Sequence, residues 1–325
     1  MVIFWVQTPH AGLTTSSMFS FPIRICWEIT SRCNYSCIHC YHNKNSSSPL
    51  TKNDLTYNEA AKFLGYLKGK AFEISIGGGE PLLFPNIARL LNGYVDFFQF
   101  TVSTNASLIT QPFLERFSKK ISFQISIDGL EATHNLIRNK KNAFKKSINS
   151  IELLLDNGYK ASVGITISKL NINEIGTLIK LLKREGISFF HFNTYIGSHP
   201  VLMLDKRCMV EANKILDMLS GDSSVKVSIR DPLFDLCPGS CQACITTVNI
   251  CPNGDVTPCC YLDDLLGNIR KRSLQRVWLS DKAKHYRHPL SFACEKCDSF
   301  DKCRGGCWAR KKVISGRDNL CFQKT

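Results

Sequence analysis

The sequence predicts an α/β protein in which a parallel sheet, curved into a partial (β/α)6 TIM-like barrel, precedes a small cysteine-rich domain. Short apolar runs alternate with amphipathic segments over the first two-thirds of the chain, and 11 of the 16 cysteines lie in the final 89 residues. Polar motifs also follow directly after several apolar runs. Alternating strands and helices form parallel sheets covered by helices, and such barrels place their chemistry at the carboxyl ends of the strands.

Six β–α units are expected, on the basis of β-branched and aromatic runs and of apolar residues repeated every three or four positions. The expected strands are Ile23–Ile29, Phe72–Ile76, Phe98–Ser103, Ile121–Ile127, Ala161–Ile167 and Ser188–Thr194. The expected helices are Tyr57–Leu67, Gln111–Ser118, Ala143–Asn157, Asn173–Lys183 and Arg207–Leu219. The chain thus divides into a tail (1–21), a barrel (22–230) and a cysteine-rich domain (231–325).

Three cysteines, Cys33, Cys37 and Cys40, follow the first expected strand at the spacing Cys-x3-Cys-x2-Cys. Iron–sulfur cubanes are usually closed by four cysteine thiolates, so three thiolates would leave one iron open to a ligand. Structural zinc and buried thiols are alternatives. Disulfides are disfavoured because the chain shows no secretory signal. The sequence contains no run of about 18 apolar residues, so no membrane span is predicted.

A glycine-rich turn, Gly77-Gly78-Gly79-Glu80-Pro81, follows the second expected strand. Glycines lack a Cβ and let the backbone approach a ligand closely, and the Glu80 carboxylate suits an ammonium group. Together with the cysteine triplet, this turn resembles the two signatures of the radical S-adenosylmethionine (SAM) superfamily.

Further motifs at strand ends resemble those with which this superfamily binds SAM. By that resemblance Asn105 lies near the ribose, Ser126 belongs to a Ser-x-Asp-Gly motif with Asp128, and Arg138 meets the SAM carboxylate with two parallel donors. Turn formation is the alternative for Asn105 and Asp128. His39 occupies the position of an aromatic group against adenine, or else is a solvated loop histidine. The residues expected to bind SAM are His39, Gly78, Gly79, Glu80, Asn105, Ser126 and Arg138.

The resemblance implies a catalytic [4Fe–4S] cluster whose open iron chelates the amino and carboxylate groups of SAM. One electron from a flavodoxin- or ferredoxin-type donor would cleave SAM to methionine and a 5′-deoxyadenosyl radical, which would abstract hydrogen from the substrate. In such enzymes the cofactors carry the chemistry, and the protein supplies position and excludes water.

The cysteine-rich tail resembles the SPASM extension of radical SAM enzymes, which binds auxiliary iron–sulfur clusters. The resemblance implies one auxiliary [4Fe–4S] cluster on Cys294, Cys297, Cys303 and Cys321. It implies a second on Cys244, Cys259 and Cys307, with Cys241 preferred over Cys237 as fourth ligand. A structural zinc site is the alternative, although the segment 266–278 also resembles SPASM. The remaining thiols are interpreted as structural: Cys26, Cys208, Cys251 and Cys260.

The sequence gives weaker evidence for the class of substrate than for the cofactors. The net charge of +14 favours anionic partners, but a solvated basic surface explains most of it, and no nucleic-acid module is present. The expected substrate is a ribosomally made peptide, presented by a separate leader-peptide-binding protein because the barrel begins near Ile23. The alternative is oxidation or decarboxylation of a small molecule, such as a tetrapyrrole propionate or a sugar acid. The alternative to an enzyme is an iron–sulfur electron carrier or scaffold. A cytoplasmic location is expected.

No general base can be assigned from the sequence. The weak candidates lie near expected strand ends, where a histidine can move protons near neutral pH; hydrogen bonding within barrel loops is the alternative role. They are Tyr41, His191 and Tyr195, followed by His42, Asn193 and His199. Sulfatase-maturing enzymes carry an acidic residue at the position of Cys260, so that activity is not expected.

Overall fold

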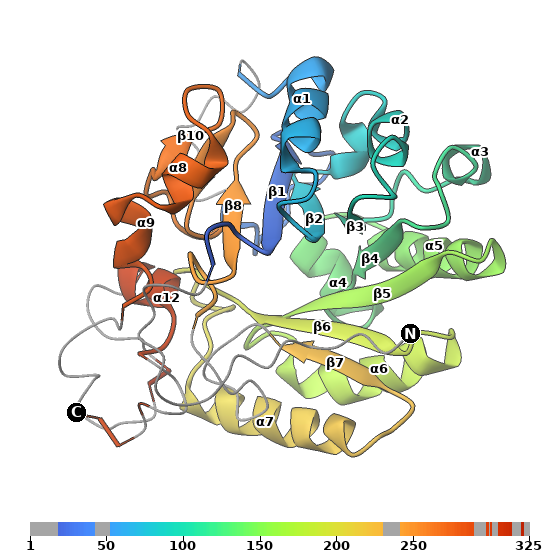
Figure 1. Cartoon of the computed structure of the whole chain (residues 1–325). Coiled ribbons are helices and arrows are strands. Elements are labelled where there is room, and N and C mark those ends of the chain that lie inside the picture. The colour runs from blue at the N-terminus through green and yellow to red at the C-terminus, as the bar shows by residue number, and fades with distance from the viewer. Residues whose placement is uncertain are drawn as a thin grey trace.

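The computed structural model describes residues 19–42, 53–229, 241–288, 297–298, 300, 305–313 and 320–321. Within them one ten-stranded sheet runs in the order β10-β9-β8-β1-β2-β3-β4-β5-β6-β7. Neighbouring strands from β1 to β7 are parallel, and the helices that connect them lie around the outside of the curved sheet (Figure 1). The fold is therefore the expected α/β partial barrel.

The barrel strands are β1 (Arg24–Thr30), β2 (Glu73–Gly78), β3 (Gln99–Thr104), β4 (Ser122–Ser126), β5 (Lys160–Ile167), β6 (Phe189–Thr194) and β7 (Lys226–Ile229). The helices are α1 (Tyr57–Leu67), α2 (Ile87–Asn92), α3 (Gln111–Leu114), α4 (Glu131–Arg138), α5 (Ala143–Asp156), α6 (Ile175–Arg184) and α7 (Lys206–Ser220). The expected strands and helices are confirmed, except that α3 ends at Leu114 rather than Ser118. The sequence did not predict α2, α4 or β7.

The two faces of the barrel sheet differ in polarity. Apolar side chains such as Ile25 and Trp27 are buried against the helices, and the Trp27 ring centroid lies 5.3 Å from that of Phe63 in α1. Side chains alternate between the faces of a strand, so the intervening positions line the barrel interior. From Ser75 in β2 to Thr166 in β5, these positions mostly carry small or amide side chains: Ser75, Thr101, Ser103, Ser122, Gln124, Ser126, Ser162 and Thr166.

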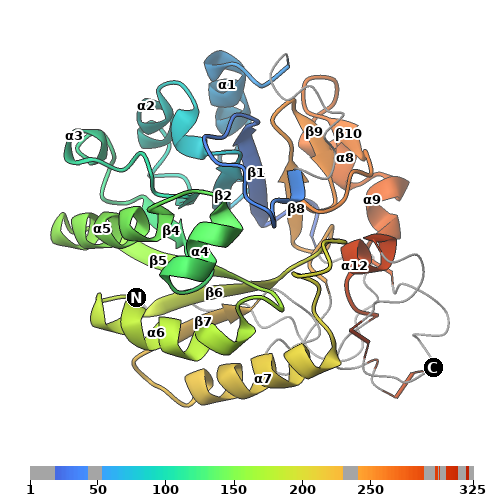
Figure 2. The same cartoon turned by 180° about the vertical axis from the view of Figure 1, so that it is seen from behind.

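The cysteine-rich region extends the barrel sheet. Strand β8 (Thr247–Ile250) pairs in parallel with β1, followed by antiparallel β9 (Asp255–Thr257) and β10 (Gly267–Asn268). These strands and helices α8 (Leu274–Trp278) and α9 (Asp281–His285) lie beside β1 in both views (Figures 1 and 2), and α12 (Trp308–Val313) follows. The predicted boundary at 230–231 falls outside the described residues. No described helix is long and apolar enough to cross a membrane.

Arg270 connects this extension to the start of α1. Its Nε lies 2.6 Å from Glu59 Oε1, its Nη2 donates to Glu59 Oε2 (3.0 Å), and its Nη1 donates to the carbonyl of Asn253 (2.9 Å). Glu59 also closes the capping box of α1 with Thr56. The hydrogen bond from Arg270 lowers the pKa of Glu59 from 4.5 to about 2.

We expect Arg270→Ala to lower the free energy of unfolding by about 1 kcal/mol, because the guanidinium is exposed and its ion pair is screened by solvent. The folded-state pKa of Glu59 is depressed, so its contribution is present above about pH 4.5 and is lost as the pH falls toward 2. Thermal unfolding of the anaerobic holoenzyme at pH 7 and pH 4 measures both effects. Arg272→Ala removes the same charge from an exposed neighbour and serves as control; equal destabilisation by both variants would contradict the assignment.

Candidate functional site

The loop after β1 brings Cys33, Cys37 and Cys40 together. The three thiols lie close enough to interact electrostatically with one another. The amide of Cys40 donates to the carbonyl of Cys37 (3.2 Å), and that of Ile38 donates to Ile137 in α4 (2.9 Å). Burial raises the pKa of Cys37 to about 11, while the positive charge of Arg138 acts in the opposite direction and favours the thiolate.

The donor set of this loop consists of three cysteine thiols. Among the described residues, no three His, Cys, Asp or Glu side chains are grouped closely enough to hold one metal ion. Cysteine thiolates are the ligands that hold iron–sulfur clusters. Cys33, Cys37 and Cys40 stay the predicted ligands of the catalytic cluster.

The glycine turn packs against the loop that carries the triplet. A Cβ at Gly78 would lie 2.5 Å from the carbonyl oxygen of Thr30, and one at Gly79 would lie 2.2 Å from that of Arg32. The close approach at these two glycines is thus to the backbone of β1 and its loop. A Cβ at Gly77 would meet nothing within 4 Å, so open space adjoins the inner face of the barrel there.

Glu80 and Asn105 hold strand ends in place. The buried Glu80 carboxylate accepts hydrogen bonds from Thr104 Oγ1 (2.7 Å), the Asn105 amide (2.9 Å) and the Leu82 amide (3.1 Å). Asn105 Nδ2 donates to Asn34 Oδ1 (2.8 Å) in the cysteine loop. The contacts predicted for Glu80 with the SAM amino group and for Asn105 with the ribose stay predictions.

A fully buried carboxylate, Asp128, organises the wall beside Cys37. Its Oδ2 lies 2.7 Å from Arg138 Nη2 and 3.5 Å from His39 Nε2, and its Oδ1 accepts from the Thr166 amide (3.0 Å). Burial opposes ionisation of Asp128, but the Arg138 and His39 neighbours lower its pKa overall. Arg138 also hydrogen-bonds Cys37. Burial lowers the pKa of His39 to about 4, so its imidazole is neutral at pH 7.

The structure therefore gives Asp128 more than a turn-forming role, and it places Arg138 between a carboxylate and a predicted cluster ligand. Ser126 ends β4, two residues before Asp128 on the inner face of the sheet. The predicted contacts of Arg138 with the SAM carboxylate, of His39 with adenine and of Ser126 with the cofactor stay predictions.

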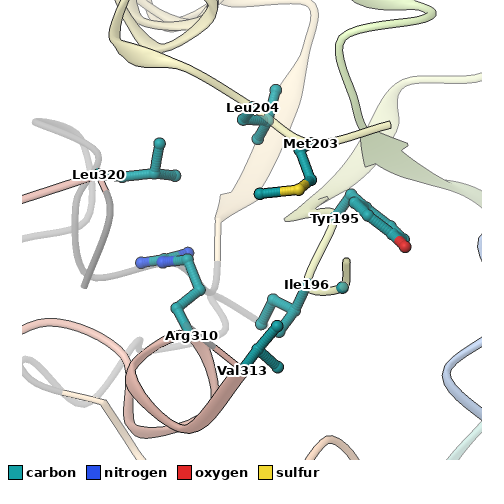
Figure 3. A pocket seen from close by; sticks show the side chains of 8 residues that line it. Tyr195, Ile196, Met203, Leu204, Arg310, Val313 and Leu320 are labelled. Carbon is teal, nitrogen blue, oxygen red and sulfur yellow. The ribbon is translucent and has the colours of Figure 1, made fainter. Parts of the chain in front are cut away.

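The six candidates for a general base do not form one group. Tyr41 and His42 adjoin the cysteine triplet, whereas His191 and Asn193 are half-buried on the inner face of β6. Tyr195 lines a small pocket of about 10 Å³ with Met203, Leu204 and Arg310 (Figure 3). The amide of His199 donates to the Tyr195 hydroxyl (3.3 Å).

Glu28 was missed by the sequence prediction. It lies within β1, is 5% exposed, and accepts a hydrogen bond from the Tyr41 hydroxyl (2.9 Å). The available signal was a carboxylate between the apolar residues Trp27 and Ile29 of a strand. Cys251 and Cys260 also adjoin this region, because Cys251 interacts with Glu28, and Cys260 with Tyr41.

A second group of thiols lies in the sheet extension. Cys259 interacts electrostatically with Cys241 and Cys307, and Cys244 with Cys241. Burial raises the pKa of Cys259, and that of Cys244 to about 12. These contacts support Cys241 as the fourth ligand of this cluster, which stays a prediction; Cys237 lies outside the described residues.

The other predicted auxiliary set is only partly described. Cys297 and Cys321 are half-buried, whereas Cys294 and Cys303 lie outside the described residues. The assignment of these four cysteines to one cluster stays a prediction.

A parallel partial barrel with a thiol triplet at its first strand end, and further thiols beside it, defines an iron–sulfur enzyme of the radical SAM class. Comparison with known families agrees: the radical SAM superfamily matches residues 27–182, and the SPASM iron–sulfur cluster-binding domain matches residues 230–308. The chain belongs to the radical SAM superfamily and carries a SPASM domain. Its cofactors are accordingly SAM, a catalytic [4Fe–4S] cluster and auxiliary iron–sulfur clusters.

Relatives with assigned names cover most of the chain. An AdoMet-dependent heme synthase of Methanosarcina barkeri is 26% identical over 92% of this chain and 95% of its own. The mycofactocin maturase MftC of Mycolicibacterium smegmatis is 27% identical over 93% of this chain and 83% of its own. Crystalline Streptococcus suis SuiB bound to SAM shares the fold, with a TM-score of 0.77, 20% identity and coverage of 94% of this chain and 78% of its own. SuiB has also been crystallised with its precursor peptide SuiA.

Proposed function

We propose that this radical SAM enzyme modifies a ribosomally made peptide. The observation that carries the proposal is the polar inner face of the barrel, where hydroxyl and amide side chains replace the apolar ones that face the helices. A peptide backbone that leaves water needs hydrogen-bonding partners, and Ser, Thr and Gln side chains both donate and accept.

The relatives support both substrate classes. The maturase MftC and the peptide-bound SuiB favour a peptide, whereas the heme synthase of similar identity favours a tetrapyrrole. A flat macrocycle requires a large, mainly apolar cavity. The inner face of β2 to β5 supplies little apolar surface for one, so the peptide is the better match for the described part of the barrel.

Each group of residues in the site has its own proposed role. Cys33, Cys37 and Cys40 would hold the catalytic cluster, and the space beside Gly77 would admit the cofactor. Together the bound cluster and SAM supply the one-electron chemistry that removes a hydrogen atom from the substrate. Arg138, which is paired with Asp128, would hold Cys37 in position through a hydrogen bond. The barrel wall excludes water from the reacting groups.

The predicted partners belong to the same proposal. A flavodoxin- or ferredoxin-type donor would supply the electron, and the net charge of +14 would attract such an acidic protein. A separate leader-binding protein would present the peptide. The barrel would occupy 22–230, the SPASM domain 231–325, and the enzyme would work in the cytoplasm.

Anaerobic holoenzyme, SAM and dithionite should be incubated separately with each short peptide encoded beside the gene and with an iron tetrapyrrole that carries propionate groups. We expect one peptide to lose hydrogen or change its fragmentation pattern, with stoichiometric release of 5′-deoxyadenosine, while the tetrapyrrole is unchanged. Mass spectrometry measures both. Conversion of the tetrapyrrole without change in any peptide would overturn the proposal in favour of the small-molecule alternative.

A further inference from the structure

Glu28 is a buried acid on the inner face of the barrel, where the catalytic and auxiliary regions meet. Its strand β1 pairs with β2 on one side and with β8 of the SPASM region on the other. Its carboxylate contacts Tyr41 and His42 from the loop of the catalytic triplet. It also contacts Asn249 and Cys251, at the end of β8.

The Glu28 side chain lies on the inner face of the barrel rather than on the face that packs against the helices. Glu28 is the register partner of Gly77 in β2, and paired residues of neighbouring strands point to the same face of a sheet. An added Cβ at Gly77 would meet nothing within 4 Å. The space that would admit the cofactor therefore lies at the same level of the barrel as Glu28, so a substrate that reacts with the bound cofactor would come near this carboxylate.

The neighbours make this carboxylate a suitable proton acceptor. Burial raises the pKa of Glu28 from 4.5, while His42 and hydrogen bonds from Tyr41, Asn249 and Cys251 act in the opposite direction. An acceptor works best when its pKa approaches the operating pH. The Tyr41 ring, which lies 5.2 Å from that of Tyr261 and 4.3 Å from that of His42, fixes the direction of the hydroxyl that holds the carboxylate.

We propose that Glu28 accepts the proton that the substrate loses when its radical is oxidised. The inference rests on the proposed radical oxidation of a peptide; decarboxylation of a propionate releases CO2 and one electron, so it would need no proton acceptor. After hydrogen abstraction, an N–H, O–H, S–H or C–H bond beside the radical centre breaks: its proton goes to the Glu28 carboxylate, one electron goes to an iron–sulfur acceptor, and a new π or σ bond forms. The acid lies on β1, and Cys260 interacts with the same Tyr41 that donates a hydrogen bond to it.

The first test needs no substrate. Infrared difference spectra between wild-type and Glu28→Gln holoenzyme isolate the C=O stretch of the protonated Glu28 carboxyl. The intensity of this band should be measured from about pH 4 to pH 8. We expect the carboxyl to titrate above the ordinary value of 4.5. Tyr41→Phe removes a hydrogen bond that stabilises the carboxylate, so it should move the midpoint further upward. A carboxyl that titrates at or below 4.5 would overturn the proposal.

The second test separates proton acceptance from radical formation. With the substrate that the wild type converts, Glu28→Gln should release 5′-deoxyadenosine within about threefold of the wild-type rate, yet form product about 100-fold more slowly. Glu73→Gln is the matched control: Glu73 also faces the barrel interior, at the opposite end of the strands, where it pairs with Arg24 (2.7 Å). It should change neither quantity.

A wild-type ratio of product to 5′-deoxyadenosine in Glu28→Gln would overturn the assignment. Wild-type enzyme that converts neither peptide nor tetrapyrrole would contradict the proposed function instead. The infrared titration would still decide whether Glu28 holds a proton near neutral pH.

Discussion

Simultaneous replacement of Cys33, Cys37 and Cys40 with alanine is expected to abolish reductive cleavage of SAM. The three thiols converge at the end of β1 and interact with one another, and no other described group beside Gly77 offers a set of thiolates. Without them the catalytic cluster has no ligands. The auxiliary thiols lie in separate segments, so their clusters should persist and total iron should fall by roughly one-third.

Production of 5′-deoxyadenosine, iron and acid-labile sulfide measure this outcome in anaerobically reconstituted protein. Cys208→Ala is the matched control, since it removes a buried thiol from α7 that is not among the predicted cluster ligands. It should retain full SAM cleavage. Persistent 5′-deoxyadenosine in the triple variant, or stoichiometric zinc without sulfide in the wild type, would refute the cluster assignment.

Asp128→Asn is expected to lower the free energy of unfolding by about 3 kcal/mol, because it leaves the guanidinium of Arg138 buried without its counter-charge. Asp128 is 0% exposed and Arg138 9% exposed, so solvent cannot replace the lost ion pair. The asparagine keeps the shape and still accepts from the Thr166 amide. Denaturant unfolding of the holoenzyme, monitored by far-UV circular dichroism, measures the change.

Two companion variants identify the cause. Asp96→Asn removes a carboxylate from an exposed pair with Lys120 and should cost less than about 0.5 kcal/mol. The double variant Asp128→Asn/Arg138→Met removes both buried charges and should be more stable than Asp128→Asn alone. A double variant that is less stable than the single one would show that the buried charge is not the cause.

Most of the barrel could be predicted because its signals are local. Alternating apolar and polar residues such as those of Ile121–Ile127 mark strands, and the capping box at Thr56 and Glu59 marks the start of α1. Helix α4 was missed because it is short, and its buried face includes His134 and Arg138, which serve the Asp128 site. The pairing of β8 with β1 joins residues more than 200 positions apart. Neither segment carries a local sequence signal that identifies the other as its neighbour in the sheet.

The residues of the candidate site also differ in whether their role has a local sequence signal. Cysteine spacing and the glycine turn are visible along the chain, so the thiol triplet was predictable. The environment of Glu28 depends on its register with Gly77 and on Tyr41, which reaches it from a loop. Likewise, Asp128 resembles an ordinary turn residue until the fold brings Arg138, His39 and Thr166 around it.

The pairing of β8 with β1 has a mechanical consequence. The ladder of paired residues from Arg24–Thr247 to Trp27–Ile250 joins the two regions in one sheet, so the regions that carry the catalytic triplet and Cys259 would not move apart as independent bodies. The gap that electrons must tunnel across would stay constant through the catalytic cycle. Substrate must then enter over the rim of the barrel, and any opening and closing must come from loops rather than from separation of the two domains.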